Sequence, residues 1–127
     1  MHQAEFVRFR SRFADSRGAF VGVFGLINVL GRHGMLTPEE DRFRRESNAW
    51  YDSAYPDPYA ANSSLSDRPL AASWFRVSAI PLLDRVPDYL AILDAHSIAW
   101  ERVETDEPGE VLYEDEHQVV ADPAARA

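Results

Sequence analysis

The chain has 127 residues, of which 46% are hydrophobic and 27% charged, and it contains no cysteine. Seven Phe, five Tyr and three Trp exclude a disordered chain, and the absence of cysteine excludes disulfides and thiolate metal or redox sites. The length predicts a single domain over residues 1–127.

The net charge of −8 is concentrated near the C-terminus. Residues 101–122 contain nine Asp or Glu and one basic residue, Arg102, so this segment alone carries −8. Such a segment faces water or a basic partner, and because it repels phosphate we expect no nucleic-acid binding. All the basic residues are Arg, which favours a bacterial source of high GC content.

The most apolar run, residues 19–31, is too short to span a bilayer, for which about 20 residues are needed. It also lacks the flanks of a signal peptide. These features predict a cytoplasmic protein with no membrane partner.

Large apolar residues recur at a spacing of seven in the N-terminal part: Phe6, Phe13, Phe20 and Ile27. This spacing favours one helix, or two helices separated near Gly18. A strand is the alternative for residues 4–17, since arginine alternates with other residues from Val7 to Phe13.

A second helix is predicted over residues 38–54. Thr37 is in the N-cap position, Pro38 occupies the first turn, and Glu40 completes a capping box. Residues 55–69 then predict a long loop, of a length that is often functional.

Asp67 is expected to cap a third helix that starts near Pro69 and buries three apolar side chains: Leu70, Trp74 and Val77. Pro81 is expected to interrupt this helix, and Pro87 to begin another helical segment.

Beyond His96 the apolar period changes to two, which predicts strands over residues 98–105, 111–113 and 118–121. Turns are predicted at residues 106–109 and 114–116. The expected fold is α+β, with helices over about 1–96 packed on one face of a three-stranded antiparallel meander over about 98–121. A short disordered tail is expected at 122–127.

Aromatic and acidic residues cluster around the end of the second helix, and they form the predicted ligand site: Trp50, Tyr51, Tyr55, Asp57 and Tyr59. Ring faces beside carboxylates suit a cationic or flat organic ligand, and Arg44 could hold an anionic group. The alternative is that these rings seal the helix end onto the core.

Catalytic candidates are His96, Asp57 and Tyr55, although a histidine at a helix C-terminus also has an ordinary capping role. Residues 114–117 contain ligand types for a metal but lack any established spacing. We therefore predict no metal and no cofactor.

Two functions remain open. The first is binding of a basic protein, or of a second copy through a sheet edge, by acidic residues of the meander: Glu107, Glu110, Glu114, Asp115 and Glu116. The alternative is a small-molecule enzyme or ligand carrier, which requires a cavity of roughly 300 Å³ beside residues 50–59. The sequence does not decide whether the protein is an enzyme.

Overall fold

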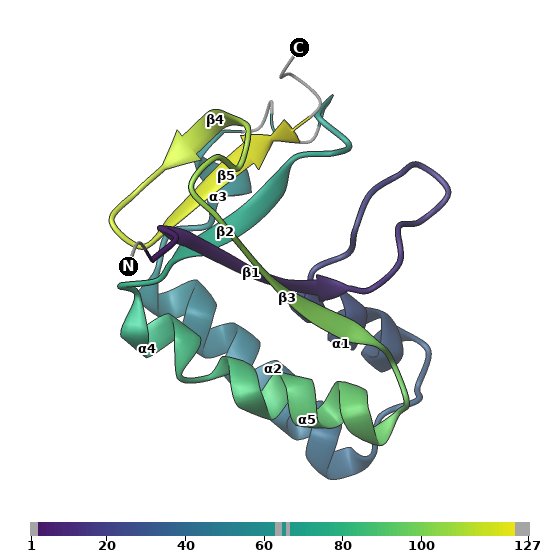
Figure 1. The fold of residues 1–127 in the computed structure, drawn as a ribbon. Helices are drawn as coiled ribbons and strands as arrows, with labels where there is room; N and C mark the ends of the chain where they lie inside the picture. Colours follow the sequence, from purple (N-terminus) through teal and green to yellow (C-terminus); the bar gives the residue numbers. More distant parts are fainter. Residues whose placement is uncertain (1–2, 63–64, 66, 124–127) are drawn as a thin grey trace.

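The structure, a computed structural model, describes residues 3–62, 65 and 67–123. Its strands are β1 (Phe6–Ser11), β2 (Ala72–Arg76), β3 (Trp100–Thr105), β4 (Glu110–Glu114) and β5 (Gln118–Asp122) (Figure 1). Its helices are α1 (Val23–Arg32), α2 (Pro38–Ala54), α3 (Pro58–Ala61), α4 (Ile80–Leu83) and α5 (Val86–Ala95). The predicted α+β class is confirmed.

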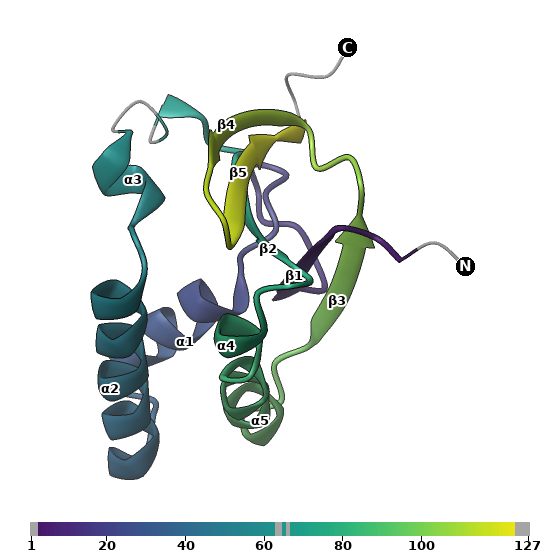
Figure 2. The same ribbon diagram turned by 90° about the vertical axis from the view of Figure 1, so that its left-hand side faces the viewer.

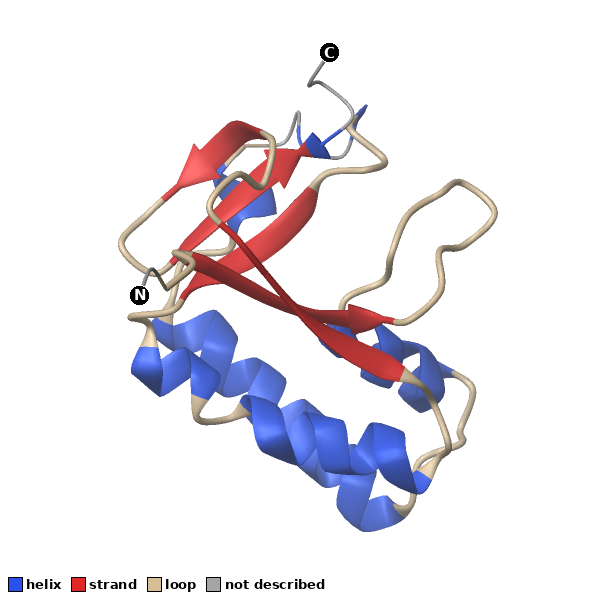
Figure 3. Cartoon of the chain, in the orientation of Figure 1, coloured by secondary structure: helices blue, strands red, loops and turns tan. Residues whose placement is uncertain are grey.

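The five strands form one antiparallel sheet in the order β3-β1-β2-β5-β4, and α1, α2, α4 and α5 lie on one side of it (Figure 3). Strands β1 and β3 pair along six residues, whereas β1 and β2 pair only at Phe6–Arg76 and Val7–Phe75. Beyond Val7 the two strands diverge, as Figure 1 shows. The sheet is therefore split into a β3–β1 ribbon and a β2–β5–β4 ribbon.

The N-terminal segment corrects the helical prediction. Residues 6–11 form β1, and the first helix begins only at Val23. Pairing with β3 and β2 satisfies the backbone of this segment, and the arginine alternation of residues 7–13 was the signal for a strand. The sevenfold spacing of phenylalanines was therefore misleading.

The helix predicted from Pro69 is also wrong, because residues 72–76 form β2 in the middle of the sheet. Its sequence, ASWFR, contains two aromatic residues that suit a strand with neighbours on both sides. Pro81 does not interrupt a helix; it lies in the first turn of α4, where its missing N–H is not needed.

The C-terminal meander is only partly present. Strands β4 and β5 form the expected hairpin, but β3 pairs with β1 and lies at the opposite edge from β4. The turn at 106–109 therefore carries the chain between the two edges. Gly109 has φ +126°, and a Cβ there would lie 2.6 Å from the carbonyl oxygen of Asp122. Of the predicted tail, Asp122 belongs to β5, and residues 124–127 lie outside the described residues.

The helix at 38–54 is confirmed, and its capping box is complete. The Glu40 backbone N–H donates to Thr37 Oγ1 over 3.1 Å, and the Thr37 N–H donates to Glu40 Oε1 over 2.9 Å. The helical segment at Pro87 is confirmed as α5, with His96 as its C-cap residue.

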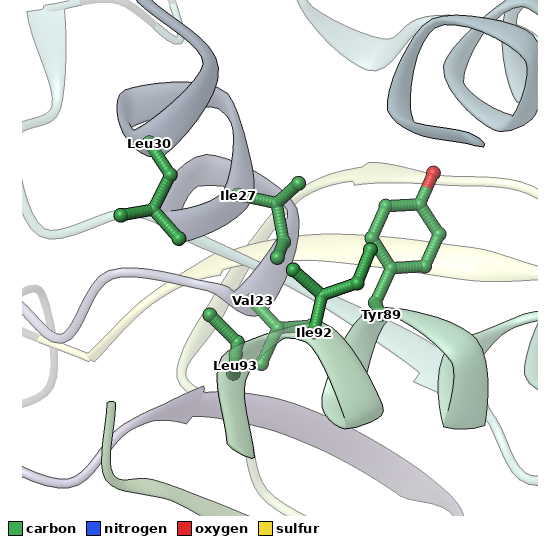
Figure 4. Close-up of a cluster of buried hydrophobic side chains, with 6 residues drawn as sticks. All are labelled: Val23, Ile27, Leu30, Tyr89, Ile92 and Leu93. Atoms are coloured by element: carbon green, nitrogen blue, oxygen red, sulfur yellow. The ribbon is translucent and has the colours of Figure 1, made fainter. Parts of the chain in front are cut away.

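Helices α1 and α5 pack against each other through buried side chains (Figure 4): Val23, Ile27, Leu30, Tyr89, Ile92 and Leu93. We call this group the closed cluster. Each of these residues is less than 9% exposed. Phe9 of β1 and Trp100 of β3 pack on its periphery, which joins the helices to the β3–β1 ribbon.

Candidate functional site

A cavity of about 350 Å³ lies between the sheet and helices α1 and α2. Residues of several elements line it: Val7, Arg8 and Phe9 of β1, Gly22, Phe24 and Asn28 of the α1 region, Asn48, Tyr51 and Asp52 of α2, Tyr55, Asp57 and Pro58 of the following segment, Ser73 and Phe75 of β2, Leu82 of α4 and Gln118 of β5. Figure 2 shows α2 and α3 following one another along one side of the molecule. The volume is in the range of small-molecule sites.

Aromatic rings frame the cavity in edge-to-face contacts. The ring of Phe24 lies 5.2 Å from that of Tyr51 and 5.9 Å from that of Phe75. The Tyr51 hydroxyl donates to the Leu82 carbonyl over 2.6 Å, which fixes the ring. Burial, together with the neighbouring Tyr89, raises the pKa of Tyr51, so the phenol stays neutral. Tyr51 therefore serves as an apolar wall.

A chain of hydrogen bonds leads from the core to the cavity. The Tyr89 hydroxyl donates to Asn48 Oδ1 over 2.7 Å, and Asn48 Nδ2 donates to Asn28 Oδ1 over 2.8 Å. Within the described part of the chain, the Asn28 amide nitrogen has no acceptor of its own. Since Asn28 lines the cavity, this nitrogen is a donor available to a ligand.

Acidic and aromatic residues mark the end of the cavity near α3. Asp57 and Asp52 are both exposed, and the Asp57 carboxylate accepts the Tyr59 N–H over 3.0 Å as the N-cap of α3. The Tyr55 ring meets the His117 ring edge-on at 4.8 Å. The carboxylates of Asp52 and Asp57 therefore bring negative charge to a part of the cavity lining that is open to solvent.

Arg8 borders the cavity where β1 and β2 diverge. Its Nη1 donates to the Ser73 carbonyl over 2.9 Å, and its Nη2 donates to the Phe20 carbonyl over 2.7 Å. Burial, with a smaller effect of the like charge of Arg10, lowers the pKa of Arg8 to about 10. The guanidinium is therefore charged at neutral pH but poorly solvated.

The predicted ligand residues are only partly brought together. Tyr51, Tyr55 and Asp57 line the cavity, whereas Trp50 and Tyr59 do not. The Arg85 guanidinium lies over the Trp50 ring, and the distance from Arg85 Cζ to the ring centroid is 3.9 Å.

Two further candidates lie away from the cavity. Arg44 pairs with Asp41 of its own helix over 2.8 Å and does not line the cavity. His96 bonds through Nε2 to Glu40 Oε1 over 2.8 Å, at the start of α2. This hydrogen bond holds the pKa of Glu40 below its usual value. His96 thus links α5 to α2.

The acidic residues of the meander have mixed surroundings. Glu110 pairs with Arg68 over 3.3 Å, and Glu114 pairs with Arg76 over 2.6 Å. Glu116 is 89% exposed, and its carboxylate lies 4.0 Å from His117 Nε2. Glu107 lies exposed in the turn after β3, where its backbone N–H donates to Thr105 Oγ1.

Asp115 organises the turn between β4 and β5. It accepts hydrogen bonds from the backbone N–H groups of His117 and Gln118 and from the Tyr113 hydroxyl. Burial opposes ionisation, but these hydrogen bonds outweigh it and lower the pKa of Asp115. The Asp115 carboxylate therefore stabilises the turn of the β4–β5 hairpin.

Most lining residues from β1, α1 and β2 were not predicted from the sequence. The main ones are Arg8, Phe24, Asn28, Ser73 and Phe75. For Arg8 a signal existed in the alternation of residues 7–13. For Ser73 and Phe75 it was lost because β2 was interpreted as a helix.

Comparisons with models of protein families, with curated protein sequences and with solved structures found no match. Among the described helices, none combines the length and apolar character needed to cross a membrane. Nor do the described residues contain a group of three or more His, Cys, Asp or Glu suited to a metal ion.

Proposed function

We propose that this protein binds a small, largely apolar organic molecule in the cavity between its sheet and helices α1 and α2. The observation that carries the proposal is a cavity of about 350 Å³ with aromatic walls from four elements. Phe9, Phe24, Tyr51 and Phe75 come from β1, α1, α2 and β2. Apolar walls with a few polar groups are typical of ligand sites.

The polar groups of the lining favour selective binding. The Asn28 amide nitrogen is available as a donor, and Ser73 presents a hydroxyl that makes no hydrogen bond with the described residues. A ligand that left such groups unpaired would lose affinity, because a buried unpaired polar group is costly. The ligand therefore has at least one polar end.

Binding is better supported than catalysis. The described lining contains no His, Cys or Lys, and its two carboxylates, Asp52 and Asp57, are exposed. His96, the predicted acid–base candidate, bonds to Glu40 elsewhere. A general acid or base must contact the reacting group, and of the three predicted catalytic candidates Asp57 and Tyr55 line the cavity whereas His96 does not.

Docking of a basic protein, or of a second copy through a sheet edge, remains an alternative prediction. Edge strands β3 and β4 are available for pairing in the described sheet. The pairing of Glu110 with Arg68 and of Glu114 with Arg76 leaves less charge for a partner than the sequence indicated. We therefore prefer the cavity.

The test is binding of the neutral fluorescent probe N-phenyl-1-naphthylamine to the whole chain. We expect saturable binding at one site, and a loss of at least about tenfold in affinity in Ser73→Leu, whose side chain enters the cavity. Ser73 shares a sheet face with Phe75, two residues along β2, which contacts Phe24.

The matched control is Ser78→Leu, since Ser78 is exposed and outside the cavity lining. It should bind the probe as the wild type does, with both variants showing the wild-type circular dichroism. Absence of saturable binding by the wild type, or equal binding by the two variants, would reject the cavity as the binding site.

A further inference from the structure

The split in the sheet places a cation at the cavity. Because β1 leaves β2 after Val7, the Ser73 carbonyl accepts its hydrogen bond from the Arg8 guanidinium. The second bond, to the Phe20 carbonyl, holds the other end of the guanidinium. An arginine has five N–H donors, so donors remain beyond these two bonds.

The charge of Arg8 has no ionic partner within the described chain. Each of Arg68 and Arg76 pairs with two carboxylates, but no described Asp or Glu lies within 4.0 Å of the Arg8 guanidinium. Its neighbour Arg10 carries the same charge. Removing part of the hydration of a cation without supplying an anion is costly, and a bound anion would offset that cost.

We propose that Arg8 recognises the carboxylate of a planar aromatic acid, whose ring system lies against the wall that Phe24, Tyr51 and Phe75 form through their mutual ring contacts. This inference rests on the proposed function, because it specifies the ligand of the same cavity. Arginine suits a planar carboxylate, to which it can donate two parallel hydrogen bonds.

The carboxylates of the lining attract a cationic ligand less strongly than Arg8 attracts an anionic one. Asp52 and Asp57 are exposed, and charges in contact with water are screened by solvent and salt. Arg8 is half-buried, and burial is the main cause of its lowered pKa, so its field acts through a lower effective dielectric than that of the exposed carboxylates. The acid group therefore points toward Arg8 and the apolar body toward the aromatic walls.

Arg8 also borders a second hollow, on the other face of the sheet, which Arg10, Arg17, Phe20 and Trp74 help to line. An anion could approach the same guanidinium from that groove. The experiment therefore has to separate the two faces. Arg10 lines the groove and not the cavity, which makes Arg10→Gln the matched control.

The test uses two probes of equal shape, 2-naphthoate and its neutral amide 2-naphthamide, titrated calorimetrically into the whole chain. We expect the wild type to prefer the acid by at least about tenfold, as a charge-assisted hydrogen bond provides. Arg8→Gln should lose the preference and still bind the amide. Arg10→Gln should keep the preference, and Ser73→Leu should lose both probes.

Gly22→Ala supplies a second variant if Arg8→Gln fails to fold. A Cβ at Gly22 would lie 3.4 Å from Arg8 Nη1 and 3.6 Å from Nη2, an ordinary contact, and the φ of −67° suits alanine. The new methyl group takes up space beside Nη1 and Nη2 that an approaching carboxylate would use, so Gly22→Ala should weaken the binding of naphthoate several-fold more than that of naphthamide.

Several outcomes would overturn the inference. Equal binding of acid and amide by the wild type, or binding of neither by a protein that binds N-phenyl-1-naphthylamine, would refute the acid ligand and leave the proposed function intact. Loss of the preference in Arg10→Gln, or its survival in Ser73→Leu, would place the anion in the groove. Failure of all three probes would reject both proposals.

Discussion

The two ends of the helix–sheet interface are built differently. At one end, the closed cluster packs aliphatic side chains of α1 and α5 together with Tyr89. At the other end, α1 and α2 face β2 and β5 across a cavity of about 350 Å³. Helix α1 takes part in both, since Ile27 lies in the cluster and the next residue, Asn28, lines the cavity.

The difference lies in how the side chains are held. Figure 4 shows the side chains of the closed cluster pointing toward one another from α1 and α5, and all of them are buried, as in a densely packed core. At the open end, Tyr51 is held through its hydroxyl by Leu82 and Asn48 is bonded to Asn28, so these groups cannot collapse inward without losing hydrogen bonds. The hydrogen bonds of Tyr51 and Asn48 therefore hold the cavity open.

The largest effect is expected at the closed cluster. Leu93 is fully buried there, so Leu93→Ala should lower the free energy of unfolding by about 2–5 kcal/mol in urea denaturation. Val111→Ala is the control, because Val111 is 46% exposed and its truncation should cost within about 0.5 kcal/mol. Equal costs would contradict the packed cluster.

A smaller effect is expected at the open end. Tyr51→Phe removes the hydroxyl that bonds to the Leu82 carbonyl and should lower the free energy of unfolding by about 1 kcal/mol. The control, Tyr59→Phe, removes a hydroxyl from a side chain outside the cavity and should have almost no effect. If the two substitutions cost the same, the Tyr51 hydroxyl does not hold the wall.

The smallest effect is a pH dependence at the link between α2 and α5. The hydrogen bond from His96 lowers the pKa of Glu40 in the folded state. Its contribution to stability is therefore present above the unfolded pKa of about 4.3 and is lost as the pH falls through the lower folded value. Wild type should lose more stability than Glu40→Gln between about pH 5 and pH 3.

Glutamine is a suitable replacement at this position because it also occurs in capping boxes. Denaturation curves of both proteins across this pH range measure the difference. Identical slopes would mean that the bond between Glu40 and His96 does not contribute to folding.

Several elements of the fold were predictable from nearby residues. Thr37, Pro38 and Glu40 determine the start of α2, and Pro87 marks the first turn of α5, because caps and first turns depend on contacts within one turn of helix. The β4–β5 hairpin was also predictable, since its strands are adjacent in the sequence.

Other elements depended on distant partners. Residues 6–11 became a strand because β3 and β2 are available to pair with them, and residues 72–76 because β1 and β5 lie on either side. Strand β3 likewise pairs with the distant β1 and not with β4, the next strand in the sequence. Such pairings are tertiary choices that local patterns do not encode.

The candidate site divides in the same way. The sequence by itself determined that Tyr51, Tyr55 and Asp57 lie together at the end of α2, because they are close in the chain. Only the tertiary structure decided that Arg8 borders the same cavity. Its position depends on the divergence of β1 from β2, and hence on hydrogen bonds between strands about 65 residues apart, such as that from Arg8 to Ser73.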